Sequence, residues 1–404
     1  MGKAEAKSKM GYGSIVKVPF GPQHPALKEP ENFIFEVEGD IIVDVKPRIG
    51  YNHRGIEKAM EVRTYIQNIY LAERICGICS DAHTTCYCQA IEELLDVEAP
   101  PRAKYIRVIV AELERLHSHS LWVGIAAHEI GFDTLFMHLW RDRETVMDIL
   151  EIVSGNRVHY AMNTIGGVRR DISSDIIPKI KKGIDFLEER IKDYIKTVEA
   201  DPTIRERTVD VGMLKPKDAV ELCAVGPTLR ASGVKNDVRK DDPYAAYDEI
   251  PFNIVISDGC DVYARIIVRC QEMLESINMI RYALDNLPSG MIRVRVPMAV
   301  PAGEAVSRVE APRGELIHYA KSNGTSKPER YKVRSPTLAN IPALCKMLLG
   351  QHVADIPIVL AGIDPCFACM DRIAIIDAKT QKKRVMNLEA LRRHSRKWRR
   401  THSH

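Results

Sequence analysis

The sequence has no run of apolar residues long enough to cross a membrane, and it has little cysteine. A membrane-spanning helix needs about 18 or more apolar residues, whereas residues 356–361 form one of the longest apolar runs. Ten cysteines in 404 residues lie far below the roughly 8–10% of a disulfide scaffold. Residues 1–7 contain no apolar core, so we expect no secretory signal. We therefore expect membrane association to come only through partners, and cysteines to be metal ligands or core residues.

Basic and acidic residues nearly balance over the whole chain but not within it. The net charge is +4, and residues 373–404 contain ten lysines and arginines against Asp377 and Glu389. This basic C-terminal extension carries +8 and leaves −4 for the remainder. The extension lacks the interleaved aromatic residues and fold motifs of nucleic-acid-binding proteins, so no nucleic-acid partner is expected.

Length and hydrophobic periodicity predict an α+β protein that is mainly α-helical. The chain length corresponds to two or three structural units of about 150 residues each. Residues 175–198 have the clearest helical stripe of apolar positions, and residues 60–75 and 80–95 are also predicted as helices. Strands are predicted near both ends of the chain, at 15–20, 33–38, 41–46, 292–296, 307–309, 316–320 and 331–333.

These elements predict a central bundle of long helices, with small β elements from the N- and C-terminal parts. The expected segments are a flexible arm at 1–13, a β-rich segment at 14–58, the helical bundle at 59–288, a β/α segment at 289–372 and the basic extension at 373–404.

Two short cysteine pairs at opposite ends of the helical body are the main functional signal. Cys76 and Cys79 form one C-x-x-C motif, and Cys366 and Cys369 form another. A tight turn places both sulfurs of such a motif on the same side, where they bind one metal. If the two ends of the chain pair, all four sulfurs meet at one site, closed by residues 289–372. The remaining cysteines lack paired ligands and are interpreted as core thiols: Cys86, Cys88, Cys223, Cys260, Cys270 and Cys345.

The spacing alone leaves the identity of the metal open. Zinc is the usual occupant of a four-cysteine site, but zinc modules usually place their pairs some tens of residues apart. Here almost the whole chain separates the pairs. Soft thiolates also suit nickel and iron, so structural zinc and a reactive transition-metal site are equally favoured at this point.

The residues around both pairs resemble the metal-binding signatures of nickel–iron hydrogenase large subunits. Residues 73–83 (ERICGICSDAH) are similar to R-x-C-G-x-C-x-x-x-H, and residues 364–372 (DPCFACMDR) to D-P-C-x-x-C-x-x-H/R. Residues 311–318 (APRGELIH) and 335–340 (SPTLAN) are similar to two further motifs of that family. The family resemblance implies a helical large-subunit fold.

Two N-terminal motifs are similar to one branch of the family. Residues 20–25 (FGPQHP) and 53–57 (HRGIE) match the energy-converting, membrane-bound branch and the related quinone-site subunit of respiratory complex I. The complex I subunit has lost the thiol ligands, whereas this chain has all four. The resemblance covers roughly residues 14–372.

The resemblance implies a nickel–iron centre whose iron carries carbon monoxide and cyanide ligands. Cys76 and Cys366 would be terminal nickel ligands, and Cys79 and Cys369 would bridge nickel to iron. The implied reaction is heterolytic cleavage of H2 or reduction of protons, with a terminal thiolate such as Cys366 as the base.

The motifs also imply residues around the metals. Pro336 and Thr337 would lie at the cofactor, and Thr337 and Arg313 would offer donors to the ligands of iron. Arg313 with Asp364 would cap the open coordination position. Glu29 aligns with the proton-gating glutamate of the family, although taken alone it is an ordinary exposed acid.

Three further residues carry more specific expectations. His83 follows Cys79 by four residues on a helix and would reach back toward that thiolate, or else is simply packed. Ser118 occupies a position where other hydrogenase branches carry an aspartate, so one capping carboxylate is missing. Glu57 would hold Mg²⁺ or Fe²⁺ near the C-terminus of the mature chain.

The basic extension has two interpretations. In many family members an endopeptidase cuts after the last residue of the second cysteine motif, which is Arg372 here, and would remove residues 373–404. Alternatively, residues 387–400 form a basic helix that docks on an acidic partner or on lipid headgroups.

The resemblance implies the catalytic large subunit of an energy-converting hydrogenase on the cytoplasmic side of the cell membrane. Its implied partners are an iron–sulfur small subunit, ferredoxin, integral membrane subunits that translocate ions, and maturation factors. The alternative is a non-catalytic, complex I-like coupling subunit that holds structural zinc or no metal.

Overall fold

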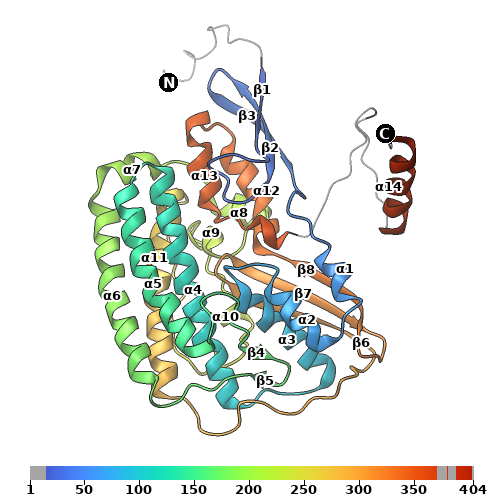
Figure 1. The fold of residues 1–404 in the computed structure, drawn as a ribbon. Coiled ribbons are helices and arrows are strands. Elements are labelled where there is room, and N and C mark those ends of the chain that lie inside the picture. Colours follow the sequence, from blue (N-terminus) through green and yellow to red (C-terminus); the bar gives the residue numbers. More distant parts are fainter. Residues whose placement is uncertain (1–14, 371–379, 381–387, 403–404) are drawn as a thin grey trace.

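The computed structural model describes residues 15–370, 380 and 388–402 (Figure 1). Long helices dominate these residues, and the sheets are small. The structure thereby confirms the predicted α+β, mainly helical class. The arm predicted at 1–13 and the cleavage position after Arg372 lie outside the described residues.

A three-stranded antiparallel sheet is formed by the N-terminal part of the chain. Its strands, in spatial order, are β1 (Val16–Phe20), β2 (Asn32–Glu38) and β3 (Ile41–Arg48). Phe33 and Phe35 on β2 are fully buried, as expected of alternate residues on a strand with one packed face. Their cluster includes residues of α12 (Pro336–Leu348) and α13 (Ile356–Gly362). The sheet therefore joins the beginning of the described chain to its C-terminal part, as Figure 1 shows.

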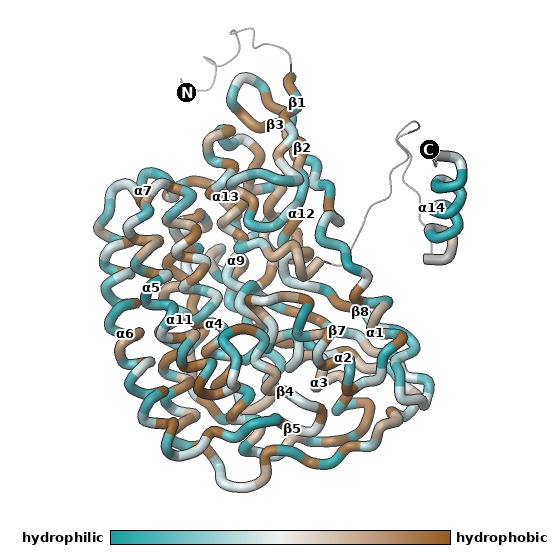
Figure 2. Tube along the Cα trace, viewed as in Figure 1, coloured by the Kyte–Doolittle hydropathy of each residue, from teal (hydrophilic) through white to brown (hydrophobic). Residues whose placement is uncertain are grey.

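Long helices pack side by side in the central bundle, as predicted. They are α4 (Pro101–Glu129), α5 (Asp133–Ser154), α6 (Ile177–Ala200) and α11 (Val262–Asp285). The stripe expected at 175–198 is present on α6, where Ile180, Ile184 and Ile191 are buried, and Figure 2 shows hydrophobic and hydrophilic positions alternating along this helix. Short helices connect α6 to α11: α7 (Pro202–Thr208), α8 (Pro216–Glu221), α9 (Pro227–Arg230) and α10 (Val238–Asp241).

A buried ionic network lies between α4 and α11. Glu112 on α4 pairs with Arg115 at 3.1 Å and with Arg239 at 3.0 Å. It also accepts hydrogen bonds from the hydroxyl groups of Tyr247 and Ser276, each at 2.6 Å. Burial opposes ionisation of this carboxyl, but the two guanidinium groups outweigh it and lower the pKa of Glu112 to about 2.

The segment before the first cysteine pair forms two helices rather than the single helix predicted at 60–75. The helices of this region are α1 (Ile56–Met60), α2 (Tyr65–Glu73) and α3 (Ser80–Leu95). The break occurs at Thr64, whose side chain accepts from the amide of Gln67 while the Gln67 side chain accepts from the Thr64 amide. This capping box starts a new helix and explains the failure of the prediction.

A second antiparallel sheet supports α3. Its strands, in spatial order, are β6 (Gly303–Ala311), β7 (Gly314–Ser322) and β8 (Pro328–Arg334). Helix α3 packs against β6 and β7. Ile91 on α3 and Leu316 on β7 belong to the same buried cluster as the cysteine pairs, so this sheet forms one wall of the cysteine site.

Residues 292–296, predicted as a strand, have no strand ladder. They lie beside a minimal hairpin of β4 (Asn163–Thr164) and β5 (Gly167–Val168), and only Arg293 forms a bridge, with Gly167. A two-residue partner strand is too short to extend the pairing, which is why the predicted strand is absent.

The chain returns to the second cysteine pair through short elements. They are the 3₁₀ turns η1 (Val353–Asp355) and η2 (Phe367–Cys369), which flank α13, and helix α14 (Leu388–His402) follows in the basic extension. None of the helices in the described residues is long and apolar enough to cross a membrane. Of the cysteines outside the pairs, Cys223 is exposed, contrary to its interpretation as a core thiol, because it follows α8 in a left-handed turn with φ 53°.

Glu112→Gln is expected to destabilise the fold strongly. It removes the charge that faces two buried arginines, and breaking a buried ion pair costs about 3–5 kcal/mol. Glu304→Gln, which weakens an exposed pair with Lys321, is the control, with an expected cost of about 0–1 kcal/mol. The free energy of unfolding is measured by denaturant titration at neutral pH.

The same measurement has a predicted pH dependence. Because the pKa of Glu112 is lower in the folded chain, its stabilising contribution is present above the unfolded pKa of about 4.3 and disappears as the pH falls toward about 2. The difference between wild type and Glu112→Gln should therefore shrink over this range. Equal costs for Glu112→Gln and Glu304→Gln at neutral pH would contradict the assignment.

Candidate metal centre

The four predicted cysteine ligands converge at one buried point. Their Sγ atoms lie within 4.8 Å of one another, with Cys76 3.3 Å from Cys366 and Cys79 3.5 Å from Cys369. Each of the four residues is at most 3% exposed. Within the part of the chain that the structure describes, no other group of potential metal ligands converges in this way.

The local backbone of the first pair favours ionised sulfur. The amides of Ile78 and Cys79 donate to Cys76 Sγ at 3.2 and 3.4 Å. Cys79 itself is the N-cap residue of α3, at the positive end of the helix dipole, but its hydrogen bond with Cys366 and its burial raise the pKa of Cys79 well above that of a free thiol. On α4, Glu114 fixes this helix end by accepting from the amides of Asp81 at 2.6 Å and Ala82 at 3.0 Å.

Arg54 connects the segments that carry the two pairs. Its guanidinium group donates to the carbonyl oxygens of Arg74 at 3.1 Å and Ile75 at 2.6 Å, just before Cys76. It also donates to the carbonyl oxygen of Ala368 at 2.9 Å, between Cys366 and Cys369. One side chain thus holds the two motifs in register.

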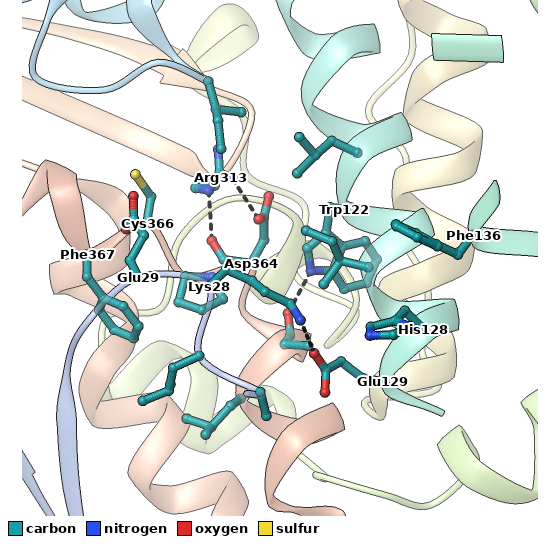
Figure 3. A pocket seen from close by; sticks show the side chains of 18 of the residues that line it. Lys28, Glu29, Trp122, His128, Glu129, Phe136, Arg313, Asp364, Cys366 and Phe367 are labelled. Atoms are coloured by element: carbon teal, nitrogen blue, oxygen red, sulfur yellow. Dashed lines mark hydrogen bonds and ion pairs between the residues drawn. The ribbon is translucent and has the colours of Figure 1, made fainter. Parts of the chain in front are cut away.

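Arg313 and Asp364 form a buried ion pair beside Cys366. Arg313 lies in the turn between β6 and β7, and its Nη2 donates to Asp364 Oδ1 at 2.7 Å (Figure 3). Its Nε donates to the Asp364 carbonyl oxygen at 2.8 Å, and its Nη1 donates to Ser118 Oγ at 3.2 Å. Ser118 therefore offers the arginine a neutral acceptor, where the resemblance led us to compare it with an aspartate of other branches.

Asp364 retains one oxygen without a partner. Burial raises the pKa of Asp364, and the Arg313 guanidinium opposes this shift without cancelling it. Its buried Oδ2 has no hydrogen-bond partner among the described residues. An unsatisfied buried carboxylate oxygen is rare in native proteins and indicates an interaction with a ligand or water.

Thr337 and Pro336 lie at the start of α12, against the second pair. Thr337 Oγ1 accepts from the amide of Cys366 at 3.0 Å, which leaves the hydroxyl proton available for donation to another group. Pro336 occupies the first helical position, where a missing amide proton costs nothing. Thr337 thus lies beside the second cysteine pair, and the roles expected of both residues at a cofactor stay predictions.

His83 contacts a different cysteine from the one expected. Its Nε2 lies 3.4 Å from Cys369 Sγ, rather than against Cys79. The reason is that Cys79 has non-helical backbone angles, φ −122° and ψ 43°, so the spacing of four residues does not place the two side chains on one helical face. Burial lowers the pKa of His83 to about 4, and the ring is neutral at neutral pH.

Glu29 is half-buried, not an ordinary exposed acid. It lies in the β1–β2 loop and accepts from the amide of Ala368 at 2.8 Å. Burial raises the pKa of Glu29, although this hydrogen bond opposes the shift. A carboxyl group with a raised pKa exchanges protons more readily near neutral pH, which is the property required of a proton gate.

An apolar cavity of about 400 Å³ connects Glu29 with Cys366, Arg313 and Asp364. Figure 3 shows Trp122 and Phe136 on the opposite wall, and the ion pair between Lys28 and Glu129, at 2.7 Å, across the cavity. The lining residues are Ala26, Leu27, Lys28, Glu29, Ile78, Leu121, Trp122, Ile125, His128, Glu129, Phe136, Trp140, Arg313, Leu360, Ala361, Asp364, Pro365, Cys366 and Phe367. The cavity therefore reaches the cysteine site at Cys366.

The chemistry of the donor set fits a soft metal centre. Four thiolates this close repel one another unless protons or cations compensate their charge. Hydrogen bonds from Cys366, Cys369 and Cys79 lower the pKa of Cys76 well below that of a free thiol, so the shared protons localise on the neighbouring sulfurs. A bound metal ion would replace those protons, and four soft sulfur ligands suit zinc, nickel or iron.

Comparison with known proteins places the chain in a family. The family described as "Respiratory-chain NADH dehydrogenase, 49 Kd subunit" matches residues 129–299 and 292–372, and the family described as "Nickel-dependent hydrogenase" matches residues 54–123. The membrane-bound hydrogenase subunit alpha of Pyrococcus furiosus is 44% identical over 92% of this chain and 90% of its own length. The carbon monoxide-induced hydrogenase of Rhodospirillum rubrum is 44% identical over 89% of this chain and 100% of its own length.

The chain belongs to the family of energy-converting hydrogenase large subunits and their complex I relatives. A chain in the solved structure of the membrane-bound sulfane sulfur reductase, an archaeal respiratory membrane complex, has the same fold. It superposes with a TM-score of 0.84 at 33% identity and covers 89% of this chain and 98% of its own length. The fold of a hydrogenase large subunit, expected from the motifs, is thus confirmed.

The divalent-ion site expected at Glu57 is only partly described. In this hydrogenase-family chain, Glu57 Oε1 accepts from the amide of Val333 at 3.0 Å, and Oε2 lies 3.6 Å from Lys332 Nζ. The opposite side of that site, at Arg372, lies outside the described residues. The ion at Glu57 stays a prediction.

Several contacts at the centre of this family member were not predicted. Arg54 was part of a recognised motif, and Glu114 lies on a predicted helix, but neither local sequence indicates which distant backbone groups the side chain contacts. His318, which contacts His83, was likewise recognised only as part of its motif. Long-range pairing of this kind has no periodic or spacing signal in a single sequence.

Arg54→Gln is expected to weaken metal retention. The substitution removes a cation that bonds three carbonyl oxygens across both cysteine motifs, and loss of a group that orients metal ligands costs 10–100-fold in metal affinity or activity. Metal content after challenge with a graded series of chelator concentrations measures the change. Arg63→Gln is the control, because Arg63 is exposed and donates within its own helical region to Ala59. Retention equal to that of Arg63→Gln would show that Arg54 does not hold the motifs together.

Proposed function

We propose that this chain is the catalytic large subunit of an energy-converting nickel–iron hydrogenase. The observation that carries the proposal is the convergence of four buried thiols from the two ends of the chain, with the Arg313–Asp364 pair beside one of them. Cys76 and Cys366 would hold nickel, and Cys79 and Cys369 would complete the ligand set of a nickel–iron centre whose iron carries carbon monoxide and cyanide ligands. Such a centre supplies heterolytic cleavage of H2 and the reverse reduction of protons.

The chain's own residues would position the substrate and move the proton. The apolar cavity admits H2, and Arg313 with Asp364 presents a fixed charge pair beside Cys366. The Cys366 sulfur accepts a proton, and Glu29, which lines the same cavity, passes it toward solvent. The hydroxyl of Thr337 and the guanidinium group of Arg313 would donate to the ligands of iron.

The proposed partners follow from the family. We infer an iron–sulfur small subunit that exchanges electrons with ferredoxin, and integral membrane subunits that couple the reaction to ion translocation. The relatives named above include a membrane-bound hydrogenase subunit and a chain of a respiratory membrane complex. We place the chain on the cytoplasmic side of the membrane as a peripheral subunit assembled with maturation factors.

The fate of the basic extension is part of the proposal. Helix α14 contains 15 residues, and eight of them are lysine, arginine or histidine, all between residues 392 and 402. Endopeptidase cleavage after Arg372 would remove it, whereas retention would leave a basic helix for an acidic partner or lipid headgroups. The intact mass of the subunit from the mature complex distinguishes the two outcomes.

A non-catalytic coupling subunit is the second candidate. The match to the 49 kDa subunit of respiratory NADH dehydrogenase over residues 129–372 favours it. In that case the thiols would hold structural zinc or no metal. Four intact cysteines support the catalytic proposal, because the related complex I subunit lacks these thiols.

Metal analysis of the purified complex tests the two candidates. We expect about one nickel and one iron per chain and infrared bands of bound carbon monoxide and cyanide. Cys366→Ser should abolish nickel binding and hydrogen turnover, because a hard hydroxyl replaces a soft thiolate. Cys345→Ser, on α12 outside the site, should leave both unchanged. Zinc alone, without the infrared bands, would overturn the hydrogenase proposal.

Glu29→Gln tests the proton route separately from metal binding. The amide cannot exchange the proton, so turnover should fall by 10²–10⁴-fold, whereas nickel content and infrared bands should stay at wild-type values. Glu36→Gln, on the N-terminal sheet away from the cavity, is the matched control. Wild-type turnover in Glu29→Gln would remove this residue from the mechanism.

A further inference from the structure

A hydrogen-bonded chain of three side chains extends from Cys369 away from the cavity. His83 Nε2 lies 3.4 Å from Cys369 Sγ, and His83 Nδ1 lies 3.1 Å from His318 Nε2. His318 Nδ1 in turn lies 2.7 Å from the hydroxyl of Tyr331. The mechanism described above uses neither His318 nor Tyr331.

The hydrogen-bonded chain is fully buried, and its three side chains come from separate elements of the fold. His83 comes from α3, His318 from β7 and Tyr331 from β8, and all three side chains have no exposed surface. His318 on β7 pairs with Val333 on β8. Tyr331 lies two residues before Val333 on the same strand. The ring of Tyr331 meets that of His318 edge-on, with centroids 5.6 Å apart. The sheet therefore fixes the geometry of the outer pair.

The hydrogen positions in this chain are coupled. Two imidazole nitrogens at 3.1 Å require one N–H donor and one acceptor, so His83 and His318 cannot both carry a proton on the facing nitrogens. In one arrangement, the Tyr331 hydroxyl donates to His318, His318 donates to His83, and His83 donates to the Cys369 sulfur. In the reverse arrangement every donor points the other way.

The hydroxyl of Tyr331, at the outer end of the hydrogen-bonded chain, determines which of the two arrangements is favoured. Among the described residues, the Tyr331 hydroxyl has no hydrogen-bond partner other than His318. In the reverse arrangement its proton would have no acceptor, and a buried unpaired donor costs about 1–3 kcal/mol. The arrangement that points every donor toward Cys369 leaves no donor unpaired.

We propose that His318 and Tyr331 are positioning residues that hold His83 in the tautomer whose Nε2–H donates to the sulfur of Cys369. A hydrogen bond to a metal ligand is commonly oriented by further hydrogen-bonding residues behind the donor. Such a bond tunes the charge on the metal-bound group. This inference deepens the proposed function and rests on it, since Cys369 is one of the four sulfurs proposed to hold the nickel–iron centre.

Tyr331→Phe tests the chain in the purified complex. The substitution keeps the ring and removes the donor, so both tautomers of His318 and His83 become populated. We expect the carbon monoxide and cyanide bands to split or to shift to lower wavenumber, because a sulfur without its hydrogen bond donates more electron density to iron. We also expect 10–100-fold weaker metal retention against a chelator.

Tyr87→Phe is the matched control. Tyr87 is equally buried, and its ring lies 5.5 Å from that of Tyr331. Its hydroxyl donates to the carbonyl oxygen of Tyr65 at 2.8 Å, outside the chain. This variant reports the cost of losing a buried hydroxyl at the same place in the fold, and its infrared bands should match wild type.

Two substitutions of His318 separate positioning from packing. His318→Gln keeps one donor and one acceptor and should restore most of the wild-type bands and metal retention, whereas His318→Phe keeps a ring without either and should behave as Tyr331→Phe does. Wild-type bands and retention in both Tyr331→Phe and His318→Phe would overturn the inference. If the wild-type complex contained no nickel and showed no carbon monoxide or cyanide bands, the proposed function would be overturned instead. Metal retention would then still test the hydrogen-bonded chain, with zinc as the bound metal.

Discussion

The fold depends on one constraint, which is that four sulfur atoms from the two ends of the chain lie within 4.8 Å of one another. The connection between the cysteine pairs spans nearly the whole chain, so the entropy lost in closing it is large. Packing of the N-terminal sheet on α12 and α13 offsets part of that loss of entropy. Arg54 then fixes the register of the two motifs locally. The helical bundle serves as the rigid spacer between these ends.

The burial of charged groups around the four sulfurs requires other groups that compensate their charge. The Asp364 carboxylate is matched by Arg313, which in turn rests on Ser118. Cys79 lies at the positive end of α3, whose first amides are satisfied by Glu114. Deeper in the bundle, Glu112 is compensated by two arginines. Each compensating group is itself buried and held by hydrogen bonds, so the centre is preorganised rather than adaptable.

The sequence predicted what repeats locally and missed what pairs at long range. The apolar stripe of α6 and the two C-x-x-C motifs are periodic or spaced signals, and the structure contains both. The helix break at Thr64 depends on a capping box that the continuous apolar pattern conceals. The partners of Arg54 and His83 depend on tertiary contacts, and the irregular backbone of Cys79 redirects a side chain that helical spacing would aim elsewhere.

The position of the cavity links the cysteine site to the N-terminal part of the chain. Its walls are shared between the cysteine site and the β1–β2 loop, because Glu29 contacts the Ala368 amide while the adjacent Lys28 pairs with Glu129 at the end of α4. A movement of that loop would therefore alter both access to Cys366 and the environment of the Glu29 carboxyl. The fold alone therefore does not fix the function of a member of this family, which depends on the chemistry of the residues at the site.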